Sequence, residues 1–218
     1  MIEDKFDEIL WLSGITAKNY KFEQEVPNRP NPLKLSKWIA QEIEEVTKQI
    51  DKIENEIGMK CSCEKGCSAC CNQLIVTLIP ECLAIQPYIK NYSKEKLEEL
   101  KRKVLEQCDI LEKNNLTNKE INNIINEKKL QKQYFDLNIS CVFLDEENLC
   151  SIYRVRPSLC WSYRNYGDKA KCEQNFDVST TIKYDDWERR VFERILAARP
   201  TKEELYVLPF AIKKIMEW

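Results

Sequence analysis

Eleven cysteines are the residues of this 218-residue sequence best suited to chemistry. Several lie only two or three residues apart, and the sequence contains no histidine. An odd number of closely spaced cysteines, behind an N-terminus unlike a secretory signal, indicates thiolate metal ligands, with disulfides between individual pairs as the alternative. The cysteines are Cys61, Cys63, Cys67, Cys70, Cys71, Cys82, Cys108, Cys141, Cys150, Cys160 and Cys172.

The densest cluster is Cys63-Glu-Lys-Gly-Cys67-Ser-Ala-Cys70-Cys71. Spacings of two and three residues allow a tight turn to bring sulfur atoms within about 4 Å of each other, as metal–sulfur bonds of about 2.3 Å require. Gly66 gives that turn its backbone freedom. Because neighbouring side chains diverge, we expect Cys70 and Cys71 to bind different metal atoms, or one of them not to be a ligand.

A second group of cysteines comes from separated turns nearer the C-terminus. Together the two groups give enough thiols for two four-sulfur sites, or for one cluster with a satellite metal. The predicted metal ligands are Cys63, Cys67, Cys70, Cys71, Cys141, Cys150, Cys160 and Cys172.

Positive charge accompanies the second group. Four thiolates around a divalent ion leave a net negative charge, which nearby cations would offset. Seven of the nine arginines lie between Arg154 and Arg199. We expect Arg154, Arg156 and Arg164 to surround the ligands, the alternative being that they only decorate an exposed loop.

The combined pattern resembles the YkgJ-type cysteine-cluster family, whose members are described as zinc- or iron-chelating domains. The resemblance runs from Cys63 to Cys172, about half of the chain. It rests on C-x3-C-x2-C-C, then C-x-F-L-D, C-x-I-Y, R-P-x-x-C and a final cysteine, with the non-cysteine positions being Phe143-Leu144-Asp145, Ile152-Tyr153 and Arg156-Pro157.

This resemblance implies metal binding by the eight cysteines. From their charge and aromatic character, Tyr153, Arg156 and Arg164 are predicted to lie beside the bound cofactor. Val142 stands where the family usually has proline, and Trp161 where it usually has arginine. These departures change the polarity around a metal but leave its ligands intact. The flagellin lysine N-methylases share part of the pattern, so a metal- or SAM-dependent enzyme that modifies proteins or peptides is an alternative implied by resemblance alone.

The metal itself is left open between an iron–sulfur cluster and zinc or iron ions. All-thiolate sites suit zinc, iron–sulfur clusters or copper(I). The irregular spacing of the later cysteines favours iron–sulfur slightly over zinc. Four aromatic residues are expected either to shield a cluster from water or to form a small core: Tyr153, Trp161, Tyr163 and Tyr166.

Two further interpretations of the cysteines carry less weight. Cys63-x3-Cys67-x2-Cys70 has the spacing of a radical-SAM cluster loop, but the chain lacks the glycine-rich contacts and the strands of that fold. A redox pair at Cys70 and Cys71 would form a strained disulfide. Three cysteines lie outside the pattern, and two of them, on predicted helices, are expected to be buried apolar residues: Cys61, Cys82 and Cys108.

Composition excludes several classes of protein. Only four glycines are present, too few and too dispersed for a phosphate loop or a dinucleotide fingerprint. Without histidine, no Ser-His or Cys-His nucleophile and no imidazole zinc ligand exists. A net charge of −2 argues against general nucleic-acid binding. No apolar run is long enough for a membrane span, so we expect a soluble, cytoplasmic protein with no membrane partner.

The elements that position the cysteines are predicted to be mainly helices. Ile39, Ile43, Val46, Ile50, Ile53 and Ile57 form a heptad stripe that ends before Gly58. That helix either packs on its own domain or presents residues 35–57 to a second copy or another partner.

Further helices are expected over residues 80–90, 93–113, 117–134, 185–199 and 201–215. Capping boxes at Thr117–Glu120 and Thr201–Glu204 mark two of their starts. Residues 93–134 are expected to form a solvated hairpin without chemistry. Phe6, Ile9, Leu10 and Leu12 anchor a short first helix.

The predicted fold is therefore mostly α, with helices packed around an irregular, cysteine-rich metal-binding centre. Residues 1–58 form an N-terminal helical region and residues 59–218 a metal-binding domain with C-terminal helices, packed as one compact unit. We predict a metal-binding protein, structural or redox. The alternatives are the modifying enzyme and a zinc-stabilised interaction module with a protein or peptide partner.

Overall fold

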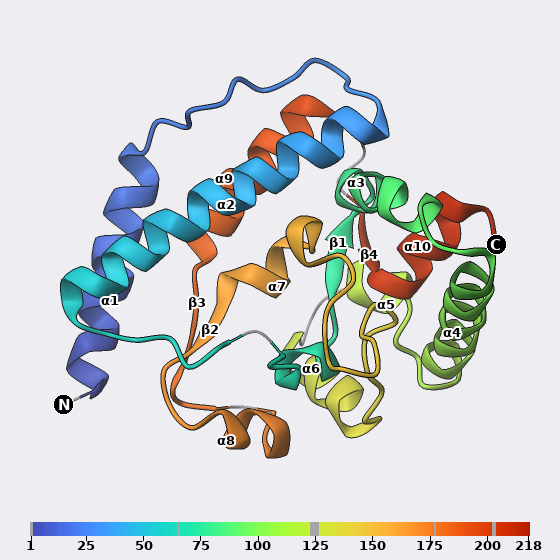
Figure 1. The fold of residues 1–218 in the computed structure, drawn as a ribbon. Coiled ribbons are helices and arrows are strands. Elements are labelled where there is room, and N and C mark those ends of the chain that lie inside the picture. The colour runs from blue at the N-terminus through green and yellow to red at the C-terminus, as the bar shows by residue number, and fades with distance from the viewer. Residues whose placement is uncertain (1, 65, 123–126, 177, 202–203) are drawn as a thin grey trace.

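The computed structural model describes residues 2–64, 66–122, 127–176, 178–201 and 204–218 (Figure 1). Helices dominate this part of the chain and only short strands accompany them, which confirms the mostly α fold. The α-helices are α1 (Ile2–Asn19), α2 (Pro32–Ile57), α3 (Ile79–Lys90), α4 (Lys94–Lys113), α5 (Asn118–Asn122), α6 (Glu127–Asp136), α7 (Ser158–Ser162), α8 (Lys169–Gln174), α9 (Asp185–Ala198) and α10 (Leu208–Met216).

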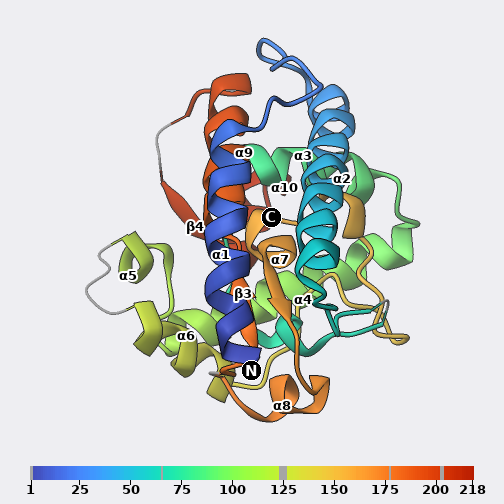
Figure 2. The ribbon, with the colours of Figure 1, turned by 90° about the vertical axis from the view of Figure 1, so that its left-hand side faces the viewer.

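The long helix α2 carries the predicted heptad stripe. Asn31 caps its start by accepting a hydrogen bond from the Lys34 amide, and Gly58 ends it in the left-handed region at φ 67°. Beside α2 lie α1 and α9 (Figures 1 and 2). The stripe is buried in the core that these helices share, through Ile39, Ile43, Val46, Ile50 and Ile53. Packing on its own chain is therefore confirmed, and the stripe is not free to form a dimer seam.

A second core lies between α3, α4 and α10. On α4, Leu100, Val104 and Cys108 are buried against apolar residues of α10 such as Leu208 and Ile212. The predicted solvated hairpin is therefore wrong for α4, because one face of this helix is apolar enough to bury. Val142, Phe143, Ile152 and Val155 join the same core, which anchors the cysteine-bearing segments between them.

Two short antiparallel strand pairs join segments that are distant in the sequence. Strand β1 (Val76–Leu78) pairs with β4 (Leu205–Val207), and Val76 lies opposite Val207. Strand β2 (Tyr163–Asn165) pairs with β3 (Thr181–Lys183). Because β1 follows the first cysteine cluster and β2 follows Cys160, both pairs hold cysteine-bearing segments in place.

The first of the two predicted capping boxes is confirmed. The amide of Thr117 donates to the Glu120 carboxylate over 3.0 Å at the start of α5. The predicted helix then appears as α5 and α6, and residues 123–126 of it lie outside the described residues.

The second predicted capping box, at Thr201 and Glu204, includes residues 202–203, which lie outside the described residues, and neither Thr201 nor Glu204 is helical. Residues 205–207 instead pair with β1, and the last helix begins at Leu208. Tertiary strand pairing overrides the local capping signal here.

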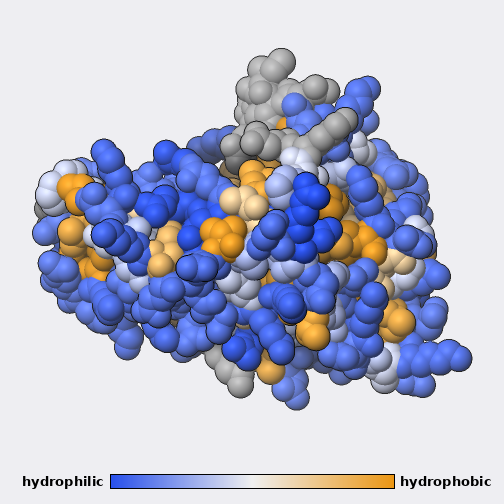
Figure 3. All heavy atoms as spheres, turned by 90° about the horizontal axis from the view of Figure 1, so that it is seen from above, coloured by the Kyte–Doolittle hydropathy of each residue, from blue (hydrophilic) through white to orange (hydrophobic). Residues whose placement is uncertain are grey.

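Among the described residues, exposed large apolar side chains are few, and three of them lie together on α1: Leu10, Trp11 and Ile15. The predicted anchor Leu10 is 45% exposed, whereas Ile9 beside it is fully buried, so the first helix is anchored by Ile9 and not by Leu10. Seen from above, the surface is mostly hydrophilic, with apolar residues in small groups (Figure 3). None of the described helices is long and apolar enough to cross a membrane.

Candidate metal centre

The first cysteine cluster leaves α2 and runs along strand β2. Ser62 fixes this segment, because its amide and its hydroxyl both donate to the carbonyl of Asn165, over 2.8 and 3.0 Å. Gly66 then takes a positive φ of 87°, as the predicted turn requires. Cys70 and Cys71 follow on a short 3-10 helix, η1 (Ala69–Asn72).

The second group of cysteines lies close to the first in space, although about 70 residues separate Cys71 from Cys141 in the sequence. The amide of Cys141 donates to the carbonyl of Cys71 over 2.9 Å, so these two chain segments are in direct contact. Asp145 shapes the next turn, because its carboxylate accepts from the amides of Glu147 and Leu149. That turn brings Leu144 and Cys150 opposite each other in an antiparallel bridge.

Cys160 and Cys172 lie on the two short helices that follow. Cys160 is on α7, after the 3-10 helix η2 (Tyr153–Val155), and Cys172 is on α8. Helix α8 packs against η1, and Lys169 at its start forms an ion pair with Glu64 at 2.7 Å. All eight predicted ligands therefore lie on segments that the fold brings to one region.

The thiols divide into two groups that interact through Cys70. In the first group, Cys63 and Cys67 both disfavour ionisation of Cys172. In the second group, Cys141 and Cys150 both disfavour ionisation of Cys160. Next to burial, Cys70 raises the pKa values of thiols in both groups. That Cys70 and Cys71 bind different metal atoms, or that one of them is not a ligand, stays a prediction.

Burial sets the protonation of the second group. It raises the pKa of Cys141 to about 12, and it also raises the pKa values of Cys150 and Cys160. Cys63 differs, because a hydrogen bond from the Cys61 thiol, the Asn165 amide and the Arg164 guanidinium together lower its pKa to about 6. Metal binding to the second group must therefore displace protons.

Arg156 and Arg164 both act on predicted ligands, whereas Arg154 acts on none of them among the described residues. Arg156 favours the thiolates of Cys70, Cys150 and Cys160, its guanidinium lies 3.8 Å from the ring centre of Tyr153, and its buried Nε has no partner in the described residues. Arg164 acts on Cys61 and Cys63 but forms ion pairs with Asp51 and Glu54, at 2.6 and 2.8 Å. Arg154 is exposed and acts on Glu44.

Most of the four aromatic residues that were predicted to shield a cluster do not surround the cysteines. Trp161 and Tyr166 are buried in the core of α1, α2 and α9, and the Tyr163 hydroxyl donates to Thr181. Tyr153 is 61% exposed. A small core, the alternative interpretation, therefore describes Trp161 and Tyr166.

Two tyrosines that the sequence did not single out lie near the thiols instead. Besides burial, Cys141 and Cys71 raise the pKa of Tyr134, and Cys150 and Cys141 raise that of Tyr92. Tyr134 lies only seven residues before Cys141, whereas Tyr92 is distant in sequence from both of the cysteines that act on it, so no local pattern indicates Tyr92.

The cysteines outside the pattern have different surroundings. Cys82 on α3 and Cys108 on α4 are fully buried in the core of α3, α4 and α10, as predicted. Cys61 is half-buried, and its sulfur accepts a hydrogen bond from the amide of Cys63 over 3.3 Å. Cys61 is therefore a neighbour of a predicted ligand, which its place outside the motif did not indicate.

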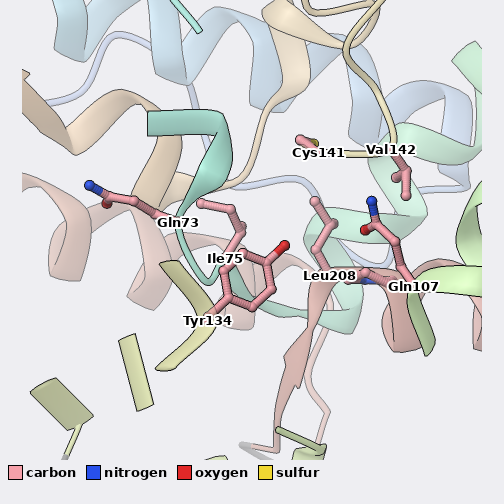
Figure 4. Close-up of a pocket in the computed structure, with 8 residues that line it drawn as sticks. Gln73, Ile75, Gln107, Tyr134, Cys141, Val142 and Leu208 are labelled. Atoms are coloured by element: carbon pink, nitrogen blue, oxygen red, sulfur yellow. The ribbon is translucent and has the colours of Figure 1, made fainter. Parts of the chain in front are cut away.

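The donor set suits zinc or iron, although the side chains are not arranged around a single point. Among the described residues, no group of three or more His, Cys, Asp or Glu side chains has an arrangement that could hold a metal ion. A pocket lies beside Cys141, where Tyr134, Gln73, Gln107 and Leu208 line it (Figure 4). Its volume of about 10 Å³ has room for about one water molecule, so it is not a site for a substrate.

Comparison with protein families decides which family the cysteine pattern represents. The model of the CxxCxxCC family, described as "Putative zinc- or iron-chelating domain", matches residues 62–180, more than half of the chain. The chain belongs to the CxxCxxCC family. The match includes all eight predicted ligands, begins just after Cys61, and supports metal binding. No curated protein and no solved structure matches the chain.

Proposed function

We propose that this CxxCxxCC protein binds several metal atoms in two adjoining thiolate groups, as an iron–sulfur cluster or a comparable polynuclear centre. Cys63, Cys67 and Cys172 would hold one part, and Cys71, Cys141, Cys150 and Cys160 the other. The observation that carries the proposal is the position of Cys70 on η1, which contacts the segment of Cys141 through the Cys71 carbonyl and packs against α8, the helix of Cys172. A shared thiol of this kind favours one joint centre over two remote mononuclear sites.

Arg156 supports the proposal through charge. Several thiolates around iron or zinc leave an excess of negative charge, and a guanidinium at their edge offsets it. The buried Nε of Arg156 has no acceptor among the described residues, so a thiolate or sulfide drawn toward the metal would satisfy it. Because Arg156 already favours three of these thiolates, its charge is available before any metal arrives.

Metal binding is expected to draw the thiols together. Six of the eight proposed ligands lie outside the α-helices, on loops or on η1, where side-chain rotation and small backbone shifts cost little free energy. These six are Cys63, Cys67, Cys70, Cys71, Cys141 and Cys150. The raised pKa values in the second group mean that binding releases protons, so metal affinity should increase with pH. When bound, an iron–sulfur centre would supply one-electron redox chemistry, and zinc would supply stability.

Metal content and visible absorption of the anaerobically purified protein test this function. A brown protein with several irons per chain is expected. Cys70→Ser should lose metal from both groups, whereas Cys82→Ser, whose thiol is buried in α3, should keep the metal content of the wild type. A colourless protein with one zinc, or full metal retention in Cys70→Ser, would contradict a joint polynuclear centre.

A further inference from the structure

Cys61 lies next to the predicted ligand Cys63, but neither the family match nor the set of predicted ligands includes Cys61. Cys61 precedes the matched residues 62–180. Its sulfur nevertheless accepts a hydrogen bond from the amide of Cys63 over 3.3 Å. The backbone between them therefore folds the side chain of Cys61 back toward Cys63.

Ser62, between the two cysteines, is held firmly by Asn165. Its amide and hydroxyl donate to the Asn165 carbonyl, and the Asn165 side-chain amide donates to the Ser62 hydroxyl over 2.9 Å. Asn165 itself is only 3% exposed, and its amide also donates to the sulfur of Cys63 over 3.4 Å. The fold thus keeps the two thiols close to each other when no metal holds them.

The two cysteines differ in how far each residue is exposed to solvent. Cys63 belongs to the exposed residues, and Cys61 is half-buried and packs against the core of α1, α2 and α9. A small oxidant can therefore reach Cys63 first, and Cys61 is placed to react with the product. An exposed attacking thiol beside a second, resolving thiol is the arrangement of reversible redox pairs.

We propose that Cys61 and Cys63 are an oxidisable dithiol, which a low-molecular-weight disulfide converts into a Cys61–Cys63 disulfide. The Cys63 thiolate attacks one sulfur of the oxidant, forming a mixed disulfide and releasing one thiol. Cys61 then attacks the Cys63 sulfur and releases the second thiol. Two protein thiols are oxidised and one disulfide is reduced to two thiols, so electrons and protons balance.

The disulfide would regulate the metal centre, and this consequence rests on the proposed function. Cys63 belongs to the same thiol group as Cys67 and Cys172, so its oxidation removes one thiolate from that group. Bound metal should in turn protect Cys63 from oxidation, because the two reactions compete for the same sulfur. The pair would then release or admit metal according to the thiol–disulfide balance around the protein.

Trypsin gives a direct readout, because it cleaves after Lys60 and Lys65 and releases a peptide with these two cysteines alone. The full-length protein is reduced, incubated with mixtures of reduced and oxidised glutathione, blocked with iodoacetamide under denaturing conditions, digested and analysed by mass spectrometry. We expect the peptide of residues 61–65 to lose both alkyl groups and to become lighter than its reduced form by two hydrogen atoms. This change should precede oxidation of Cys108, which lies alone in the peptide of residues 104–113.

Controls separate the dithiol from general thiol oxidation and from unfolding. Cys61→Ser should stop at a mixed disulfide on Cys63, whereas Cys108→Ser should behave as the wild type. Buried Cys108 should resist iodoacetamide before denaturation, which reports that the protein is folded. A peptide that stays doubly alkylated while other thiols oxidise, or a Cys63 linked to a cysteine other than Cys61, would overturn the proposal.

Comparing oxidation with and without bound zinc distinguishes failure of this inference from failure of the proposed function. The same oxidation is run on protein stripped of metal and on protein preloaded with zinc. A disulfide that forms in both samples at equal rates would retain the dithiol but contradict Cys63 as a ligand. If no disulfide forms in the metal-free protein, the dithiol is refuted, whatever the metal content shows.

Discussion

Replacing Glu81 tests how the tertiary structure holds the loop that carries Cys160. The carboxylate of Glu81 is 3% exposed and accepts four hydrogen bonds. One oxygen accepts from the Thr77 hydroxyl at 2.9 Å and the Leu78 amide at 3.0 Å. The other accepts from the amide and the hydroxyl of Ser158, both at 2.8 Å. Glu81 thereby ties the start of α3 to the start of α7, two residues before Cys160.

The change Glu81→Gln keeps the shape of the side chain but replaces one acceptor oxygen with an amide donor. Whichever way the amide turns, one backbone N–H, from Leu78 or Ser158, loses its acceptor inside the protein. An unsatisfied buried donor costs about 1–3 kcal/mol, and the remaining bonds lose their charge assistance. Burial raises the pKa of Glu81, so desolvation of the carboxylate offsets part of the stability that its four hydrogen bonds contribute in the wild type. We expect a net loss of about 2–4 kcal/mol in the free energy of unfolding.

Urea and thermal unfolding, followed by far-ultraviolet circular dichroism, measure this loss. For a chain of this size the expected change is a decrease in Tm of about 4–16 °C. Glu112→Gln on α4 is the matched control, because Glu112 is exposed and should change stability by less than about 0.5 kcal/mol. If Glu81→Gln unfolds within about 0.5 kcal/mol of the wild type, the four hydrogen bonds do not stabilise this junction and the reasoning fails.

Three further sets of substitutions test the thiolate groups and the core. Cys67→Ser and Cys150→Ser should each lose metal, measured by metal analysis after gel filtration, whereas Cys108→Ser should keep it, because its thiol is buried in α4. Arg156→Gln should weaken metal retention against a chelator by about tenfold, because it removes the charge beside the thiolates, and Arg156→Lys should weaken it less. Ile50→Ala should destabilise the protein by about 2–5 kcal/mol in urea unfolding, because it opens a cavity under α2.

Each of these expectations has an outcome that contradicts it. Metal retained in both the Cys67 and Cys150 variants would refute the ligand assignment. Chelator competition that is the same for wild type and both Arg156 variants would show that this arginine does not act on the metal. An Ile50→Ala protein within about 0.5 kcal/mol of the wild type would mean that the α2 stripe is not a core element.

Local patterns are sufficient to predict most of the helices. The period of Ile39 to Ile53, bounded by Pro32 and Gly58, predicts α2 and its buried face, because an apolar stripe of this kind must be covered. Ser93 caps α4 for a similarly local reason, since its hydroxyl accepts from the Lys96 amide. The spacing of the cysteines and of the residues between them is likewise enough to indicate the family.

Long-range contacts lie beyond the reach of such patterns. The segment at Thr201 and Glu204 has a helix-start signal, but pairing with β1 turns the residues that follow it into strand β4. Helix α4 is heavily charged on one side, and nothing nearby in the chain shows that α10 covers its apolar side. In both cases the deciding partner lies about a hundred residues or more away in the chain.

The sequence by itself determined the chemistry of this protein, because the types and spacings of its cysteines leave thiolate metal binding as the chemistry they suit best. Only the tertiary structure decided which thiols are neighbours. It placed Cys70 between the two thiol groups and Arg156 near thiols of both. It also placed Glu81 in contact with Ser158, two residues before Cys160, and the sulfur of Cys61 next to the amide of Cys63. The physical reason is that electrostatic and hydrogen-bond contacts depend on distance in space, which motif spacing limits only within a single turn.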